Sequence, residues 1–222
     1  KEAELQEVAK VKFEQRFDEL RKSLLSDSHG ALQSLGYLGA GGFGDCHRGL
    51  YYNLDCVLKS AKFSDTDWDY NLRNLNLLID EMTKMRQVHF PALVQVYCLV
   101  ENPLHPGKVC ICMEYCSGGD LKKYLSGNTH SAAWKKQACI DVLSGLSYLH
   151  HCGFIHLDLK PENIFLDAGG KLKIGDFGAC VSEGVQAKGA MTLAYASPEQ
   201  RLKADGFLTR ASDVYSVAIV LQ

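Results

Sequence analysis

The feature that most constrains the fold of this chain is a change of hydrophobic pattern about halfway along it. Before residue 114, glycines gather at 36–49 between short apolar runs with β-type residues, and this composition predicts strands joined by tight turns. After Leu121, apolar residues recur mostly with helical spacing, most clearly over 132–151. We therefore expect an α+β protein of two parts, β-rich and then mostly helical, joined near residues 114–119.

The first part also contains two segments in which apolar residues recur with helical spacing. Over residues 3–25, apolar residues recur about every four positions and charges fill the other face, which predicts an amphipathic helix. Its apolar stripe consists of Leu5, Ala9, Phe13, Phe17, Leu20 and Leu24. A second helix is predicted over 68–88. The expected strands are a hairpin within 31–62, a third strand near 55–59, and two more over 91–100 and 108–115.

Composition and charge exclude several classes of function. The net charge of −2 provides no basic field to attract nucleic acid or an acidic membrane, and 46% hydrophobic residues are typical of a globular protein. The apolar runs are much shorter than the roughly 18 residues that a membrane span needs. The nine cysteines include no CxxC pair. We expect them to be reduced, as in a cytoplasmic protein, with the nucleus also open. Residues 150–152, His-His-Cys, lack the second ligand pair of a zinc site.

Residues 39–44, Gly-Ala-Gly-Gly-Phe-Gly, have the spacing of a phosphate-binding loop. Glycine lets the backbone approach a phosphate closely, but a plain hairpin turn explains these residues equally well. A dinucleotide-binding fold would need a helix directly after the glycines, whereas residues 46–52 predict a strand. The segment therefore indicates a glycine-rich hairpin.

Two charged residues follow on neighbouring elements. Lys59 ends the apolar strand Cys56-Val57-Leu58, and Glu81 lies on the helix predicted over 68–88. Each alone would be read as a surface charge. Together they could form an ion pair in which Lys59 also reaches the α- and β-phosphates of a nucleotide.

Residues 156–163, HLDLKPEN, concentrate polar chemistry in a short stretch. Asp158 could accept a proton from a hydroxyl, Lys160 could neutralise a phosphate, and Asn163 offers a neutral oxygen to a hard cation. Thirteen residues later, Asp176-Phe177-Gly178 places a carboxylate beside a flexible glycine, which suits Mg²⁺. Any one of these features could be a polar turn, but their joint occurrence in this order is not expected by chance.

In this order, the five features resemble the eukaryotic protein kinases over about residues 32–222. The resemblance implies a bilobal fold with a helical extension at 1–30, a small β-rich N-lobe with one regulatory helix at 31–113, a hinge at 114–119 and a partial, mostly helical C-lobe at 120–222. It implies Mg²⁺-dependent transfer of the γ-phosphoryl group of ATP to a protein serine or threonine. Lys160 and Thr192 match the Ser/Thr branch rather than the tyrosine kinases.

The resemblance also assigns roles to residues. The catalytic group would be Asp158 as base with Lys160, and Lys59 paired with Glu81, while Asn163 and Asp176 would bind Mg²⁺. ATP would be bound by the glycines at 39, 41 and 44, by residues around the adenine and by the hinge: Gly39, Gly41, Gly44, Cys46, Val57, Lys59, Met113, Glu114, Cys116 and Phe165. Ser197-Pro198-Glu199 would close the activation segment, and Asp213 would hold the catalytic loop.

Leu157 departs from the family pattern. An arginine that binds a phosphate on the activation segment usually stands there, and leucine cannot make that contact. We therefore predict that phosphorylation of residues 177–199 is not the main on-switch. The alternative is a nucleotide-binding pseudokinase scaffold. A kinase of small molecules or lipids is a further alternative, which Thr192 and the SPE segment disfavour.

Two expectations concern the ends of the sequence. The chain stops at Gln222, inside what would be a central C-lobe helix, so it is expected to be a fragment of a longer protein whose later helices would supply an arginine to Glu199. Without that arginine, Glu199 is expected to find another cation or to lie exposed. The helix over 3–25 is expected either to bind a second copy or a partner, or to pack on the N-lobe.

Overall fold

The structure is a computed structural model that describes residues 2–24, 32–40, 44–105, 108–127, 129–185, 192–202 and 208–222. The chain forms two compact units, one of residues 1–83 with 96–115 and one of residues 84–95 with 116–222. The first unit contains a five-stranded sheet, and the second is mostly helical. The predicted α+β class, with strands first and helices later, is confirmed.

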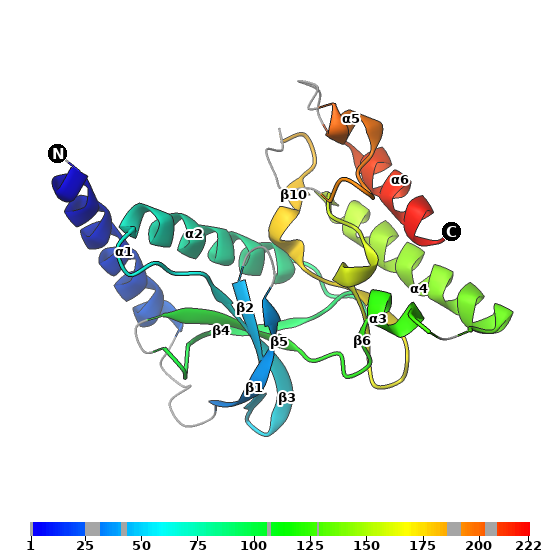
Figure 1. The fold of residues 1–222 in the computed structure, drawn as a ribbon, viewed down its shortest axis with the longest axis horizontal. Coiled ribbons are helices and arrows are strands. Elements are labelled where there is room, and N and C mark those ends of the chain that lie inside the picture. The colour runs from blue at the N-terminus through cyan, green and yellow to red at the C-terminus, as the bar shows by residue number, and fades with distance from the viewer. Residues whose placement is uncertain are drawn as a thin grey trace. The chain divides into compact units, whose positions relative to one another are not determined.

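The sheet of the first unit is antiparallel, with strand order β1-β2-β3-β5-β4 (Figure 1). Its strands are β1 (Leu32–Ala40), β2 (Gly44–Tyr51), β3 (Leu54–Ala61), β4 (Val96–Glu101) and β5 (Val109–Glu114). The strand predicted over 91–100 is wrong in its first half. There the Gln95 side chain donates hydrogen bonds to the carbonyls of Phe90 and Leu93, at 3.1 and 2.8 Å, so that a turn replaces the strand ladder.

The hairpin of β2 and β3 is tightest at Gly44. A Cβ atom at Gly44 would lie 1.9 Å from the carbonyl oxygen of Ser60, on the neighbouring strand. No real Cβ contact is that short, so this position requires glycine for the strands to pair at all. Strand pairing therefore explains why residue 44 is glycine, whether or not the loop binds a phosphate.

The first unit also contains helices α1 (Glu2–Leu24) and α2 (Trp68–Met85). The helix predicted over 3–25 is confirmed, and four residues of its stripe are buried: Ala9, Phe13, Phe17 and Leu20. Leu5 was wrongly included, because it is 65% exposed. The second helix ends three residues before the predicted residue 88. Its last turn tightens there, with Gln87 N and Val88 N donating to carbonyls three residues back.

The stripe of α1 packs within its own unit. The Phe13 ring lies 5.8 Å from the Phe63 ring, edge to face, and 5.6 Å from the ring of Trp68, the first residue of α2. Gln6 Oε1 accepts a hydrogen bond of 2.7 Å from the backbone N–H of Trp68. Figure 1 shows α1 beside the first turns of α2. These contacts support packing on the N-lobe, and they do not support the alternative that the stripe binds a second copy or a partner.

Replacing Gln6 with alanine is expected to lower the free energy of unfolding by about 1 kcal/mol, because an N–H in the first turn of α2 loses its acceptor. Urea denaturation of the intact protein would measure the change. Glu7→Ala is the matched control, since Glu7 is exposed on the same helix and its change in helix propensity is similar. Equal effects of the two substitutions would contradict the capping role.

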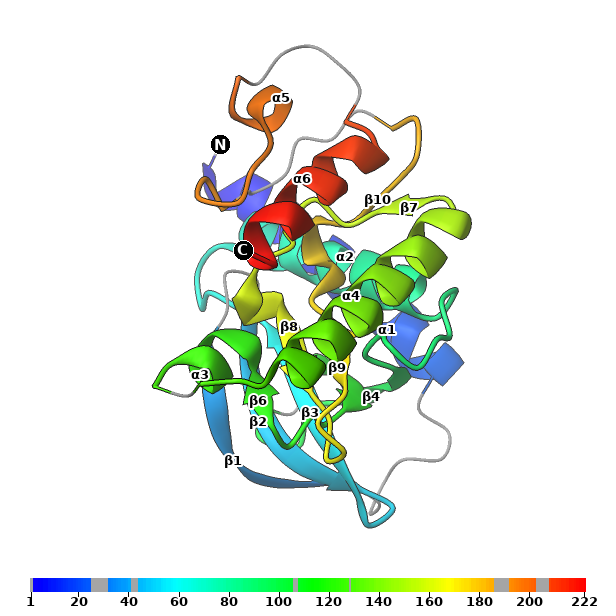
Figure 2. The same cartoon turned by 90° about the vertical axis from the view of Figure 1, so that its right-hand side faces the viewer.

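The second unit is organised around α4 (Ala132–His151), whose bounds are those predicted. Its start is fixed by Ser131, whose hydroxyl accepts a hydrogen bond of 3.1 Å from Trp134 N. Val142, Leu146 and Leu149 are buried along the helix. Figure 2 shows α6 (Arg210–Val220) running alongside α4, while α3 (Leu121–Leu125) and α5 (Pro198–Arg201) are short.

Short strands complete the second unit, and they flank the GDFG segment as predicted. A three-stranded antiparallel sheet contains β6 (Gly119–Asp120), β8 (Ile164–Leu166) and β9 (Leu172–Ile174), and β7 (Phe154–Ile155) pairs with β10 (Val181–Ser182). Two 3-10 turns, η1 (Pro161–Asn163) and η2 (Phe177–Ala179), lie next to these strands. Within the described ranges, no helix is both long enough and apolar enough to cross a membrane.

Candidate active site

The first unit contains a buried ion pair between β3 and α2. Lys59 Nζ lies 2.6 Å from Glu81 Oε1 and 2.9 Å from Oε2, and the two side chains are 9% and 3% exposed. A buried charge without a partner would cost several kcal/mol, so each residue depends on the other. The pairing that the sequence suggested is therefore present, and it fixes the lysine at the sheet.

The register of the sheet gathers other predicted residues on the face that carries Lys59. Cys46 is directly opposite Lys59, and Val57 is directly opposite Met113. Residues directly opposite on antiparallel strands share a face, as do residues two apart on one strand. Cys46, Val57, Lys59 and Met113 therefore line the same side of the sheet.

The other predicted ATP-binding residues of the first unit lie at strand ends. Gly39 is near the end of β1, opposite Cys46, and Gly44 begins β2. Glu114 is the last residue of β5, with its side chain on the opposite face from that of Met113. Gly41 lies outside the described residues.

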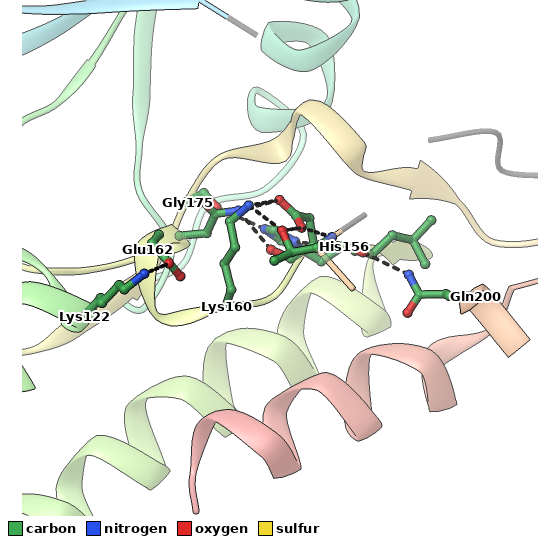
Figure 3. A network of polar contacts seen from close by, with 10 residues as sticks. Lys122, His156, Lys160, Glu162, Gly175 and Gln200 are labelled. Carbon is green, nitrogen blue, oxygen red and sulfur yellow. Dashed lines mark hydrogen bonds and ion pairs between the residues drawn. The ribbon is translucent and has the colours of Figure 1, made fainter. Parts of the chain in front are cut away.

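In the second unit, the carboxylate of Asp158 is the centre of a polar cluster, to which the Lys160 side chain in Figure 3 belongs. Lys160 Nζ donates to Asp158 Oδ2 at 2.6 Å, and Asn163 Nδ2 donates to the same oxygen at 3.0 Å and to the backbone carbonyl of Asp158 at 2.9 Å. Thr192 donates to Oδ1 from its hydroxyl at 2.8 Å and from its backbone at 3.2 Å. Asp158, Lys160 and Asn163 of HLDLKPEN thus converge on one another.

The loop that carries Asp158 is held by Asp213, on α6. The Asp213 side chain is fully buried, and its two oxygens accept hydrogen bonds of 2.8 Å from the backbone N–H groups of His156 and Leu157. His150 Nε2 lies 2.8 Å from Asp213 Oδ2, and Gln200 Nε2 donates to the carbonyl of Leu157 at 3.0 Å. Leu157 adopts φ 66°, a strained value for leucine, and these bonds hold the peptide groups on both of its sides.

His150 and Gln200 were not predicted as parts of this site. His150 was considered from the sequence only as an unlikely metal ligand, and Gln200 was not singled out. Their partners are 63 and 43 residues away in the sequence. No local motif marks such contacts, so sequence spacing gave no signal for either residue.

A second set of contacts joins Asn163 to the residue before Asp176. His156 Nε2 lies 3.0 Å from the carbonyl oxygen of Gly175, and Gly175 N donates to the carbonyl of Asn163 at 2.9 Å. Asp176 follows with φ 58°, in the left-handed region. The backbone that carries the two predicted Mg²⁺ ligands is therefore tied together by hydrogen bonds.

The donor set fits a magnesium ion that arrives with a phosphate. Among the residues that the structure describes, no three His, Cys, Asp or Glu side chains are grouped so that they could hold a metal alone. Mg²⁺ is usually bound by one or two carboxylates together with water and substrate phosphates, which does not require such a group. Because the Asn163 amide nitrogen donates to Asp158, its amide oxygen is the ligand atom that it offers.

Leu157, in the loop that carries Asp158, belongs to an apolar cluster. It is 5% exposed and packs with Ile155 and Ala179, and Val181 and Leu208 cover the cluster. Val181 on β10 is also paired with Ile155 on β7. Leu157, which was expected to be unable to bind a phosphate, therefore makes apolar contacts with residues that follow GDFG.

Two carboxylates near the site have other partners. Glu199 was expected to find a cation or to lie exposed, but it is half-buried and accepts a hydrogen bond of 2.7 Å from the Ser212 hydroxyl. Burial raises the pKa of the Glu199 carboxyl, but hydrogen bonds, led by that from Ser212, outweigh it and hold the pKa below its usual value. Glu162 accepts a hydrogen bond from Lys122 at 2.6 Å, which joins η1 to α3 (Figure 3).

The remaining predicted residues of the second unit are Phe165 and Cys116. Phe165 is half-buried on β8, and its ring would be 3.0 Å from a Cβ atom at Gly175, so the ring packs closely on the GDFG glycine. Cys116 follows β5 and is 7% exposed. The backbone carbonyl of Cys116 accepts a hydrogen bond of 3.1 Å from Gly119 N, at the start of β6.

Comparison with known proteins identifies the family. The protein kinase domain family model matches residues 32–222. The serine/threonine-protein kinase SSK22 of Saccharomyces cerevisiae is 35% identical over 161 residues, covering 70% of this chain and 12% of that protein. The serine/threonine-protein kinase PknL of Mycobacterium tuberculosis is 32% identical over 206 residues, covering 90% of this chain and 50% of that protein.

A human relative is similar to a comparable degree. The ankyrin repeat and protein kinase domain-containing protein 1 is 35% identical over 162 residues, which are 67% of this chain and 20% of that protein. The chain thus spans between about an eighth and a half of the length of these three relatives. It belongs to the protein kinase domain family, and its fold is the bilobal protein kinase fold, with a β-rich N-lobe and a mostly helical C-lobe.

Proposed function

We propose that the protein is a serine/threonine protein kinase that transfers the γ-phosphoryl group of ATP to a hydroxyl of a protein substrate. The observation that carries the proposal is the cluster in which Lys160, Asn163 and Thr192 converge on the carboxylate of Asp158. The names of the relatives support the serine/threonine class.

Asp158 is proposed to orient the substrate hydroxyl and to accept its proton late in the transfer. The hydroxyl oxygen would form a bond to the γ-phosphorus as the bond to the β-phosphate oxygen breaks, and ADP would leave. Lys160 would stabilise negative charge on the transferred group. The Thr192 hydroxyl already lies 2.8 Å from both Asp158 Oδ1 and Lys160 Nζ, which supports the view that this pair can bind an aliphatic hydroxyl.

The residues that match the family's nucleotide-binding pattern are proposed to bind MgATP. Lys59, held by Glu81, would contact the α- and β-phosphates, and Gly39, Gly41 and Gly44 would approach them through the backbone. Cys46, Val57, Met113 and Phe165 would contact the adenine ring, and the backbone at Glu114 and Cys116 would hydrogen-bond it. Mg²⁺, when bound by Asn163 and Asp176, would neutralise phosphate charge.

We further propose that activity does not depend on phosphorylation of the activation segment. Leu157 offers a phosphate no charge, and its apolar cluster supplies a different attachment for the start of the segment. Arg210 donates to Glu183 at 2.5 Å and adds a second, charged attachment there. Two kinds of contact that need no phosphate thus support the proposal. A cytoplasmic location is part of it, because all nine cysteines are free thiols.

The test is transfer of labelled γ-phosphate from ATP to serine/threonine peptides by the intact protein. We expect transfer with Mg²⁺ and none after chelation with EDTA, and we expect the rate to be unchanged after treatment with phosphatase. Tyrosine-only peptides are the control and should remain unlabelled. If transfer disappears on dephosphorylation, the proposal that activity does not depend on phosphorylation of the activation segment is wrong, while the proposed kinase activity stands. Binding of ATP without transfer under every condition would overturn the enzyme and indicate a pseudokinase.

A further inference from the structure

Three thiols meet on the face of the N-lobe sheet that lies opposite the Lys59 face. Cys112 on β5 is directly opposite Cys98 on the neighbouring strand β4. On its other side, Cys112 is directly opposite Leu58 on β3. Cys56, two residues before Leu58 on β3, therefore lies diagonally across from Cys112. Cys56 and Cys112 are fully buried in one apolar cluster, and the half-buried Cys98 and Tyr51 pack against that cluster. The three sulfurs come from three neighbouring strands.

Hydrogen bonds join these side chains. Cys112 bonds with both Cys56 and Cys98, which raises the pKa of Cys112 and lowers that of Cys56. A hydrogen bond to Cys98, with burial, raises the pKa of Tyr51 to about 12, as expected for a phenol that donates its proton to sulfur. The strand register agrees, since Cys112 lies on β5, between Cys56 on β3 and Cys98 on β4.

The register of β4 and β5, which shifts between Val96 and Cys98, makes Cys98 and Cys112 direct partners, as a cross-strand disulfide requires. Directly opposite residues of an antiparallel pair have Cα atoms about 4.5–5.5 Å apart, and disulfides join Cα atoms about 4.4–6.8 Å apart. Directly opposite residues also direct their side chains to the same face. Of the two, Cys98 is the one that solvent reaches, since Cys112 is fully buried.

We propose that Cys98 and Cys112 form a peroxide-sensitive dithiol that closes to a cross-strand disulfide. The Cys98 thiolate attacks one oxygen of hydrogen peroxide, which gives the sulfenic acid and water. The Cys112 sulfur then attacks the sulfur of that sulfenic acid, and its proton passes to the leaving hydroxide, so that the S–S bond forms and a second water is released. Two thiols are oxidised by two electrons, and one peroxide is reduced to two waters.

The site has a consequence for the nucleotide, which rests on the proposed function. Cys112 immediately precedes Met113 and Glu114, where ATP is proposed to bind. A covalent link at Cys112 fixes β5 to β4 directly before these residues. We therefore expect the disulfide to change the affinity for ATP.

The experiment treats the intact protein with hydrogen peroxide, blocks the remaining thiols under denaturing conditions and maps the peptides without reduction. We expect one linked pair containing Cys98 and Cys112, reversed by dithiothreitol, with seven thiols still blocked. Cys98→Ala should abolish the link. Cys56→Ala is the matched control, since it removes a thiol of the same cluster and should leave the link in place. Melting temperatures in reductant would show that both variants fold.

The outcomes separate the site from its consequence. A Cys56–Cys112 link, or nine thiols that all remain blocked after peroxide, would overturn the dithiol whether or not the protein is a kinase. Titration of oxidised and reduced protein with ATP tests the second step. A Cys98–Cys112 disulfide that leaves ATP affinity unchanged would overturn the proposed effect on the nucleotide, while the site itself would stand.

Discussion

Replacing Asp158 with asparagine is expected to lower kcat by about 10²–10⁴-fold, the range that a positioned general base contributes. Asparagine keeps the shape of the side chain but removes the negative charge and the ability to accept a proton. Its amide oxygen can still accept from Lys160 and Asn163, and its amide nitrogen can donate to the Thr192 hydroxyl, while the Thr192 N–H loses an acceptor at 3.2 Å. The loop should therefore keep its conformation while the chemistry is lost.

The measurements for this variant are kcat, the affinity for ATP and the melting temperature. Only kcat should change by orders of magnitude. Asp167→Asn is the matched control, because Asp167 is another loop aspartate of the same unit, which accepts hydrogen bonds from Gly169 N and Lys171 N in an exposed turn. An Asp158→Asn protein that transfers phosphate as fast as this control would contradict the role given to Asp158.

Replacing Asp213 with alanine is expected to lower the free energy of unfolding by about 3–5 kcal/mol, as for removal of one partner from a buried charged network. The substitution leaves the N–H groups of His156 and Leu157 and the ring nitrogen of His150 without their buried acceptor. Leu157, whose φ is strained, also loses the hydrogen bond from its own N–H to Asp213. Activity should fall together with stability, because Asp158 directly follows Leu157 in the chain.

Chemical denaturation of the intact protein measures this loss. Asp167→Ala again serves as control, because it removes an aspartate that accepts two backbone hydrogen bonds, but in an exposed turn. Its expected cost is about 0.5–1.5 kcal/mol per hydrogen bond at most, and less where water replaces the acceptor. A loss for Asp213→Ala no larger than that of the control would show that the buried carboxylate does not hold the loop.

Features with a local cause could be predicted from the sequence. The bounds of α4 were right because Ser131 caps the helix from the adjacent residue and the apolar repeat covers its length. Asp158, Lys160 and Asn163 converge because they are at most five positions apart and one backbone loop presents them together. The Lys59–Glu81 pair followed from the order of motifs, although the two residues are 22 positions apart.

Features that depend on distant contacts could not be predicted. The strand expected from residue 91 does not form there, because the Gln95 side chain donates to backbone carbonyls that would otherwise pair with a neighbouring strand. The hydrophobic pattern of the sequence does not predict such a side-chain hydrogen bond. Leu157 reads in the sequence only as a missing charge. Its apolar contacts with Ala179, Val181 and Leu208 exist because the fold returns those segments to the catalytic loop.

The close approach of Gly44 to Ser60 affects how descent can be inferred for related chains. Selection for the hairpin alone would retain this glycine, because any Cβ atom there collides with a backbone carbonyl. A descendant that had stopped using nucleotide would therefore still carry Gly44. At Gly39 no atom of the residues that the structure describes lies within 4 Å of the place that a Cβ atom would take, and its φ of 157° is what disfavours another residue there. In an evolutionary survey, loss of the glycine at position 39 is therefore better evidence that the loop no longer binds phosphate than loss of the glycine at position 44.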